Sequence, residues 1–225
     1  MNLKIDWSTY KFHPSGLGDI MTNSRKKDEL LSETAKSALR EAFIKEVYGR
    51  EKPDAVGTKY TQKGIMCETD SINLVQEVTG NVYFKNQKTF ENDYLIGTPD
   101  IVTPRLIDIK TPWDIFTFSA VNEDKANKDY FYQLLGYMWL LDREDADIIY
   151  ALVDTPDQMV MDEMYRLSFK MPEDQVEAYR HNYQYGDIPA ESRIKKYTFV
   201  RDEAKIAELK IRIECAREYL STLSL

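Results

Sequence analysis

The chain has 225 residues, 43% of them hydrophobic, and a formal net charge of −8. This composition predicts a packed globular core rather than a disordered chain, and no apolar run reaches the roughly 20 residues of a membrane-spanning helix. The acidic balance argues against a protein that holds nucleic acid by bulk electrostatic attraction, although basic side chains can still be concentrated on one surface.

Helices are predicted in the N-terminal third of the chain. Ser32 is a suitable N-cap for a helix that continues to about Tyr48, where Gly49 provides a stop signal. A second helix is predicted over Gln62–Val78 and ends at Gly80.

The rest of the chain alternates between short strands and helices. Runs rich in Val, Ile, Tyr and Phe predict strands over Val82–Lys85, Tyr94–Ile96, Ile101–Val102, Leu106–Lys110, Ala146–Val153 and Glu163–Phe169. Helices are predicted over 128–141, 172–185 and 201–220. We expect one α/β (α+β mixed) domain over 1–225, a central mixed β-sheet flanked by helices, with a helical N-terminal part (1–60), a core (61–170) and C-terminal helices (171–225).

Two acidic residues and a lysine stand close together in the middle of the chain. Asp108 and Lys110 are two residues apart on a predicted strand, so both side chains leave the same face. Asp100 precedes the Thr103-Pro104 turn, where a hairpin can bring it beside Asp108. Adjacent carboxylates repel each other unless a cation lies between them, and oxygen ligands suit Mg²⁺ or Mn²⁺. The set therefore predicts a metal site able to hydrolyse a phosphodiester.

Glu68 is a third acidic candidate. It shares one face of the predicted second helix with Ile65, Ile72 and Val75. A carboxylate within an apolar stripe needs a metal, a partner or exposure at the edge of the stripe. An ion pair with Arg or Lys is the alternative, but next to the Asp100 and Asp108 motif we expect a metal ligand.

Gln133 and Tyr137 are four residues apart and lie on one face of a predicted helix, one turn after Tyr130. A glutamine can hold the lysine or a water, and a tyrosine can contact a phosphate. Gly136 leaves room for close approach of another backbone. The alternative is an ordinary aromatic-rich core helix.

The stretch Pro14-Ser15-Gly16-Leu17-Gly18 leads into a short predicted helix ahead of Arg25. A serine and free amides at a helix start can bind an anion, although, read in isolation, the stretch fits a plain N-cap better.

The ordered set resembles the PD-(D/E)XK nucleases of the RecB and YqaJ type, and among them the lambda-exonuclease-like enzymes of bacteriophage recombination. KGIMCETDSINLVQEVTGN resembles the helix that bears the family's first acidic residue, GTPDIV the segment with the second, LIDIKTPW the (D/E)xK strand, and YFYQLLGYMWLL the next helix. HPSGLGDIMTNSRKK resembles the helix start that grips a 5′ phosphate in lambda-type enzymes. The resemblance implies catalytic roles for Glu68, Asp100, Asp108, Lys110, Gln133 and Tyr137, metal ligation by Glu68, Asp100, Asp108 and Ile109, and substrate binding by Ser15 and Arg25.

The resemblance further implies a restriction-endonuclease-like core and a Mg²⁺-dependent exonuclease, with Mn²⁺ as a substitute, that digests double-stranded DNA from its ends, 5′ to 3′, in recombination or DNA repair. It also implies a ring-shaped homotrimer and a single-strand annealing protein as partner. The two cysteines are too few for an iron–sulfur cluster and favour reduced thiols, so we expect a cytoplasmic protein of a bacterium or phage-infected host, without a membrane partner.

Other functions fit the same motifs. A structure-selective endonuclease can use the same core, and a DNA-end-binding protein can keep the fold without catalysis. An accidental motif in an unrelated α/β enzyme would leave Asp100 and Asp108 far apart.

The segment 113–129 contains Trp113, Phe116 and Phe118 and can form a lid, a DNA wedge or part of the packed core. We expect it to pack in the core.

Overall fold

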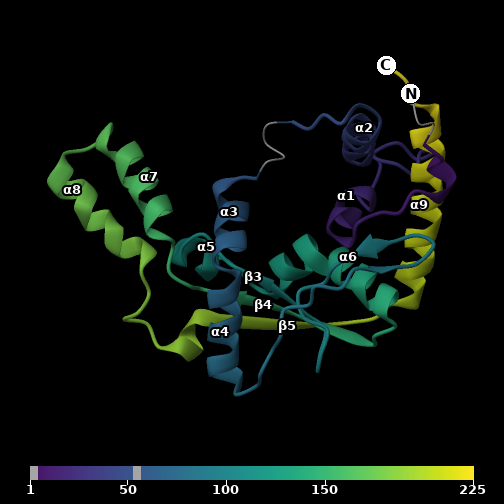
Figure 1. Cartoon of the computed structure of the whole chain (residues 1–225). Helices are drawn as coiled ribbons and strands as arrows, with labels where there is room; N and C mark the ends of the chain where they lie inside the picture. Colours follow the sequence, from purple (N-terminus) through teal and green to yellow (C-terminus); the bar gives the residue numbers. More distant parts are fainter. Residues whose placement is uncertain (1–4, 53–56) are drawn as a thin grey trace.

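A computed structural model describes residues 5–52 and 57–225. Its central sheet has three strands in the order β3-β4-β5, formed by Ile107–Lys110, Asp145–Ala151 and Ile194–Val200 (Figure 1). β3 pairs with β4 in parallel and β4 with β5 antiparallel. Helices cover both faces, so the predicted mixed α/β architecture is confirmed.

Helices dominate the described chain. The N-terminal helices are α1 (Leu17–Ile20), α2 (Glu33–Tyr48), α3 (Lys59–Met66) and α4 (Glu68–Thr79). The later ones are α5 (Ile115–Ser119), α6 (Glu123–Leu141), α7 (Asp157–Ser168), α8 (Glu173–Ala178) and α9 (Glu203–Thr222). A small hairpin joins β1 (Phe90–Glu91) to β2 (Ile96–Gly97), and short 3-10 turns include Pro14–Gly16 and Tyr179–Tyr183. None of these helices is long and apolar enough to cross a membrane.

The predicted signals at the ends of α2 are observed. The Ser32 hydroxyl accepts a hydrogen bond from Ala35 N, and Gly49 ends the helix in the left-handed region at φ 61°. Gly80 ends α4 in the same way at φ 68°. The second predicted helix is nevertheless two helices, because Cys67 leaves the helical conformation between α3 and α4.

Several strand predictions are wrong. Residues 82–85 form a loop, and Glu163–Phe169 belongs to helix α7 and the turn that follows it. Ile101 makes only a single antiparallel bridge, to Ile107. Strand β5 was not predicted, and it lies in the part expected to contain only C-terminal helices. The 172–185 helix is shorter than predicted, since a 3-10 turn follows Ala178.

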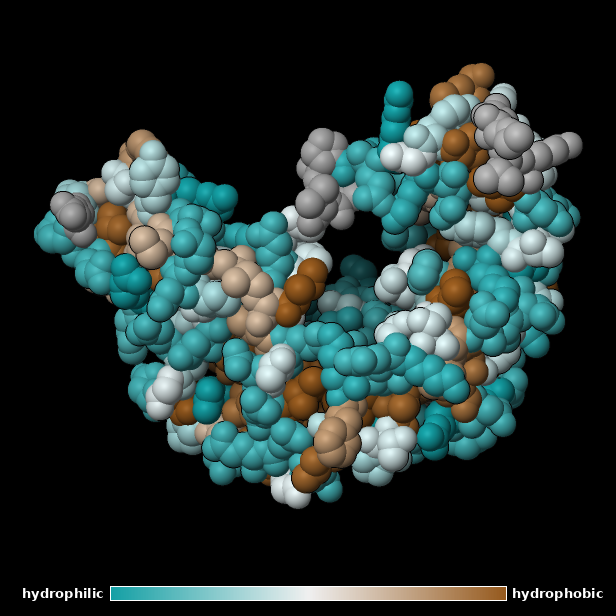
Figure 2. Space-filling model, in the orientation of Figure 1, coloured by the Kyte–Doolittle hydropathy of each residue, from teal (hydrophilic) through white to brown (hydrophobic). Residues whose placement is uncertain are grey.

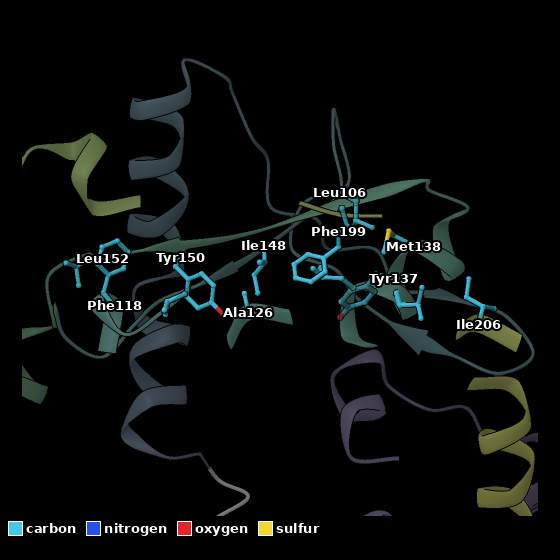
Figure 3. Packing of buried hydrophobic residues seen from close by; sticks show 14 of the residues in the cluster. Leu106, Phe118, Ala126, Tyr137, Met138, Ile148, Tyr150, Leu152, Phe199 and Ile206 are labelled. Atoms are coloured by element: carbon cyan, nitrogen blue, oxygen red, sulfur yellow. The ribbon is translucent and has the colours of Figure 1, made fainter. Parts of the chain in front are cut away.

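Two apolar clusters fix the layers of the fold. Helix α4 packs Ile72 and Val75 against Ile107 on one face of the sheet. Helix α6 packs Leu134 and Met138 against the other face. Figure 3 shows side chains of the second cluster in close view, with labels on Leu106, Phe118, Ala126, Tyr137, Met138, Ile148, Tyr150, Leu152, Phe199 and Ile206. The sheet therefore holds both the α4 and the α6 side chains at fixed positions relative to β3.

Gly136 of α6 allows the N-terminal segment to approach closely. A Cβ atom at Gly136 would lie 2.7 Å from Leu17 Cδ1 and 3.2 Å from Pro14 Cβ. A Cβ at Gly97 would lie 2.9 Å from Pro14 Cδ. The start of the chain is thus clamped against both α6 and the strand that leads to Asp100.

Gly136→Ala is expected to lower the free energy of unfolding by about 1 kcal/mol, because overpacking against buried Leu17 outweighs the gain in helix propensity. Gly64→Ala in α3 is the matched control, since its Cβ meets no atom within 4 Å, and it should raise stability by about 0.5–1 kcal/mol. Urea unfolding of both variants measures the difference. Equal stabilisation by both substitutions would contradict a tight contact at Gly136.

Candidate active site

A cavity of about 550 Å³ lies where α3, α6 and the C-terminal end of β3 meet. The space-filling view shows a broad hollow between the lobe that carries α7 and α8 and the lobe that carries α1 and α2 (Figures 1 and 2). All six residues expected to be catalytic line this cavity, namely Glu68, Asp100, Asp108, Lys110, Gln133 and Tyr137, together with Ile109. These candidates, up to 69 residues apart in sequence, therefore share one open cavity.

The hairpin expected between Asp100 and Asp108 is present. The Ile101–Ile107 bridge brings the two segments together, and Asp100 Oδ2 accepts a hydrogen bond from Ile109 N at 2.9 Å. Burial, and next the Asp108 carboxylate, raise the pKa of Asp100 well above its ordinary value. The Asp108 carboxylate therefore adds to burial in disfavouring the charged form of Asp100.

Lys110 and Gln133 hold Asp108 in place. Gln133 Nε2 donates to Asp108 Oδ1 at 2.7 Å, and Lys110 Nζ lies 2.7 Å from Asp108 Oδ2. Lys110 Nζ also lies 3.4 Å from Gln133 Oε1. Burial opposes the charge on Lys110, but Asp108 outweighs it and raises the pKa of the ammonium. Asp108, Lys110 and Gln133 thus form one closed triangle of polar contacts.

Two tyrosines of α6 complete this wall of the cavity. The Tyr130 ring lies 4.6 Å from Lys110 Nζ, within the range of a cation–π contact. The Tyr137 hydroxyl lies 3.5 Å from the carbonyl oxygen of Thr98, and burial raises its pKa. Tyr137 is 7% exposed and packs in the core as well as lining the cavity.

Glu68 occupies a different position from the one expected. It is the first residue of α4 rather than the middle of an apolar stripe, because the helix breaks at Cys67 and Ile65 is 72% exposed. Its carboxylate lines the cavity and forms an ion pair with Lys85, with the Glu68 side chain 26% exposed. The alternative considered for this residue, a lysine partner, is therefore what the structure shows.

Ser15 and Arg25 are not among the residues that line the cavity. Both are exposed on the N-terminal segment, Ser15 within the 3-10 turn that packs on α6 and Arg25 after α1.

The segment 113–129 was expected to pack in the core. Trp113 and Phe118 are only 4% and 6% exposed, which confirms packing for these two, whereas Phe116 is 66% exposed.

The donor set around β3 suits a hard cation. Asp108 Oδ2 is buried and lacks a partner of hydrogen-bond geometry, even though the Lys110 ammonium lies near it. Among the side chains that the structure describes, no three of His, Cys, Asp or Glu are placed to hold one metal ion. Two carboxylates and nearby backbone oxygens fit Mg²⁺ or Mn²⁺, but a third carboxylate requires Glu68 to leave Lys85.

Two lysines that shape the site were not predicted from the sequence. Lys85 lies in the loop wrongly predicted as a strand. Lys63 is completely buried in α3, and its ammonium donates to the Trp113 carbonyl oxygen at 2.9 Å. On the predicted helix Lys63 lies opposite the Ile65–Val75 stripe, so no signal in the sequence indicates its burial, and no local pattern pairs Lys85 with Glu68.

Comparison with solved structures identifies the group to which these features belong. A phage-related exonuclease of Haemophilus somnus 129PT is 31% identical over 94% of this chain and 94% of that chain, with a TM-score of 0.74. The chain belongs to the phage-related exonucleases. The PD-(D/E)XK nuclease fold predicted from the motifs is thereby confirmed.

Another exonuclease shares the fold of this phage-related exonuclease at lower identity. An alkaline exonuclease of Laribacter hongkongensis is 15% identical over 96% of this chain and 91% of that chain, with a TM-score of 0.64. The same enzyme in complex with dAMP gives a TM-score of 0.62 at 16% identity, over 94% and 88% of the two chains. No protein-family model and no curated protein matches the chain.

Proposed function

We propose that this phage-related exonuclease degrades linear double-stranded DNA from its 5′ ends in a Mg²⁺-dependent reaction that serves recombination or DNA processing. The observation that carries the proposal is the triangle of Asp108, Lys110 and Gln133 beside Asp100, in one open cavity of a chain 31% identical to a phage-related exonuclease.

The residues of the cavity divide into ligands and supporting groups. Asp100, Asp108, the Ile109 carbonyl oxygen and Glu68 would hold Mg²⁺, with Mn²⁺ as a substitute, and the bound metal would supply charge stabilisation and an activated water. Gln133 fixes the orientation of Asp108 through the 2.7 Å hydrogen bond. Lys110 places a positive charge where a phosphodiester gains negative charge. Tyr137 borders the same space and is assigned a phosphate contact.

A comparison of linear and closed circular DNA tests the proposal. We expect purified protein with Mg²⁺ to remove linear duplex DNA that carries 5′ phosphates, to leave closed circular plasmid intact, and to lose activity in EDTA. Labels on the 5′ and on the 3′ end measure polarity, and the 5′ label should be released first.

The controls separate the competing functions. Cleavage of the closed circle would favour a structure-selective endonuclease. If the wild type and Lys110→Ala both failed to cut while end binding persisted, a non-catalytic end-binding protein would replace the proposal.

Assembly and partners extend the proposal. A homotrimer around the duplex would provide processivity by encirclement, which is compatible with a net charge of −8. A single-strand annealing protein is the proposed partner, and Ser15 and Arg25 are assigned to a 5′ phosphate. Light scattering after size exclusion tests the trimer, and comparison of 5′-phosphorylated with 5′-hydroxyl ends tests Ser15→Ala and Arg25→Ala.

A further inference from the structure

Lys85 is the positively charged residue that pairs with Glu68. The two side chains form an ion pair in which the Lys85 side chain is 52% exposed and the Glu68 side chain, which lines the cavity, is 26% exposed. Lys85 belongs to the loop between α4 and β1, so it reaches Glu68 from outside the helix that carries the carboxylate. The pair is therefore not an incidental contact between neighbours along one helix.

Hydrogen bonds hold the Lys85 loop against the Asp100 segment. Asn86 N donates to the Asp100 carbonyl oxygen at 2.7 Å, and Asn86 Nδ2 donates to the Pro99 carbonyl oxygen at 3.0 Å. On the other side, Tyr83 N donates to Gln76 Oε1 of α4 at 2.8 Å. These bonds fix the backbone on both sides of Lys85 and direct the residue towards the carboxylate cluster.

We infer that Lys85 is a built-in counter-ion of Glu68 that competes with the divalent metal and sets the metal concentration at which the site fills. The inference rests on the proposed function. Asp100 and Asp108 share the cavity with Glu68, but the Glu68 carboxylate is paired with Lys85, and the described side chains are not arranged so that three carboxylates meet at one point. Glu68 becomes a ligand when the ammonium gives way, so each metal-binding event breaks this ion pair.

Charge repulsion acts in the same direction as competition for the carboxylate. An ammonium paired with a carboxylate that would hold a divalent cation opposes binding of that cation, and the opposition weakens as salt screens partly exposed charges. Removing Lys85 should therefore tighten metal binding, whereas loss of a merely structural side chain should leave it unchanged or weaken it.

The test is titration of the full chain with Mn²⁺ by calorimetry, without DNA and at low ionic strength. Lys85→Met is expected to lower the Kd by about 3- to 10-fold, and Lys85→Arg to retain the wild-type Kd. Lys88→Met is the matched control, because it removes the same charge three residues along the loop, where Lys88 lies over the Phe90 ring.

A double-mutant cycle shows whether Lys85 acts through Glu68. In a Glu68→Gln background, Lys85→Met should no longer tighten Mn²⁺ binding. An unchanged or higher Kd in Lys85→Met, or the same gain in Lys88→Met, would overturn the inference while leaving the metal site intact. Failure of the wild type to bind Mn²⁺ at all would overturn both the inference and the proposed metal-dependent function.

Discussion

Asp100→Asn is expected to abolish nuclease activity while making the metal-free protein more stable at neutral pH. The substitution removes one of the two adjacent carboxylates proposed as metal ligands, so the rate on linear duplex DNA should fall on the order of 10³-fold. The amide oxygen of the new side chain can still accept the hydrogen bond that Ile109 N gives to Asp100, so the hairpin should be retained. Circular dichroism checks the fold of the variant.

The expected gain in stability follows from the raised pKa of Asp100. Burial, followed by Asp108, raises this pKa in the folded protein above its unfolded value. The folded state therefore holds the proton more tightly, and the stability from this group is present at low pH and lost as pH rises through the folded pKa. Asparagine stays neutral, so the free energy of unfolding of the variant should increase relative to that of the wild type as pH rises, by on the order of 2 kcal/mol.

Urea unfolding in EDTA at pH 5 and pH 8 measures this effect. The gain of Asp100→Asn over wild type should be larger at pH 8 than at pH 5. Asp145→Asn is the control, because it removes a carboxylate that is 46% exposed and paired with Arg105, away from the cavity. A variant that is less stable than wild type at pH 8 would show that the acidic pair is not strained without metal.

Lys63→Met should change how stability depends on pH at the alkaline end. Lys63 is completely buried, and burial lowers the pKa of its ammonium to about 8, against the opposing effects of Cys67, Asp114 and Asp154. The Tyr185 ring also faces it, 5.6 Å from Nζ. Because the unfolded state binds the proton more tightly, the free energy of unfolding gains about 3 kcal/mol from this group as pH rises from about 8 to about 10.5.

The Lys63→Met variant lacks this gain. The wild type minus variant difference in unfolding free energy should therefore increase across the alkaline range, and chemical denaturation at several pH values measures it. Lys59→Met controls for the loss of one positive charge from α3, since Lys59 is partly exposed and paired with Glu163. Parallel curves for wild type and Lys63→Met would contradict the assignment of a strained buried ammonium.

The residues around β3 were predictable because their signals are local. Side chains two residues apart in a strand point to the same face, which places Asp108 and Lys110 together. Side chains four residues apart share one face of a helix, which places Gln133 and Tyr137 together. The ends of α2 at Ser32 and Gly49, and the end of α4 at Gly80, were also predictable, because capping residues act on the adjacent helix turn. The catalytic roles of these residues stay predictions, which the activity measurements described above test.

The strand predictions that are wrong concern segments whose local sequence pattern disagrees with their tertiary environment. Glu163–Phe169 alternates like a strand, but Val160 and Met164 lie on one helical face and are buried against Val176. The loop at 82–85 has β-forming residues, but it pairs with none of the strands that the structure describes, and Tyr83 N donates a hydrogen bond to the Gln76 side chain of α4 instead. The pairing of Glu68 with Lys85 depends on that loop, so spacing alone does not reveal it.

The clamp formed by the N-terminal segment has a consequence for the order of folding. Arg217 of α9 donates hydrogen bonds to the carbonyl oxygens of Tyr10 and Asp93, and Phe12 makes a parallel bridge to Leu95. The Arg217–Tyr10 contact joins residues 207 positions apart. Contacts of such long range form late, because the entropy of closing the loop must be overcome first. In a nascent chain the two segments that Arg217 joins, at Tyr10 and at Asp93 before β2, are therefore tied to each other only after α9 has been synthesised.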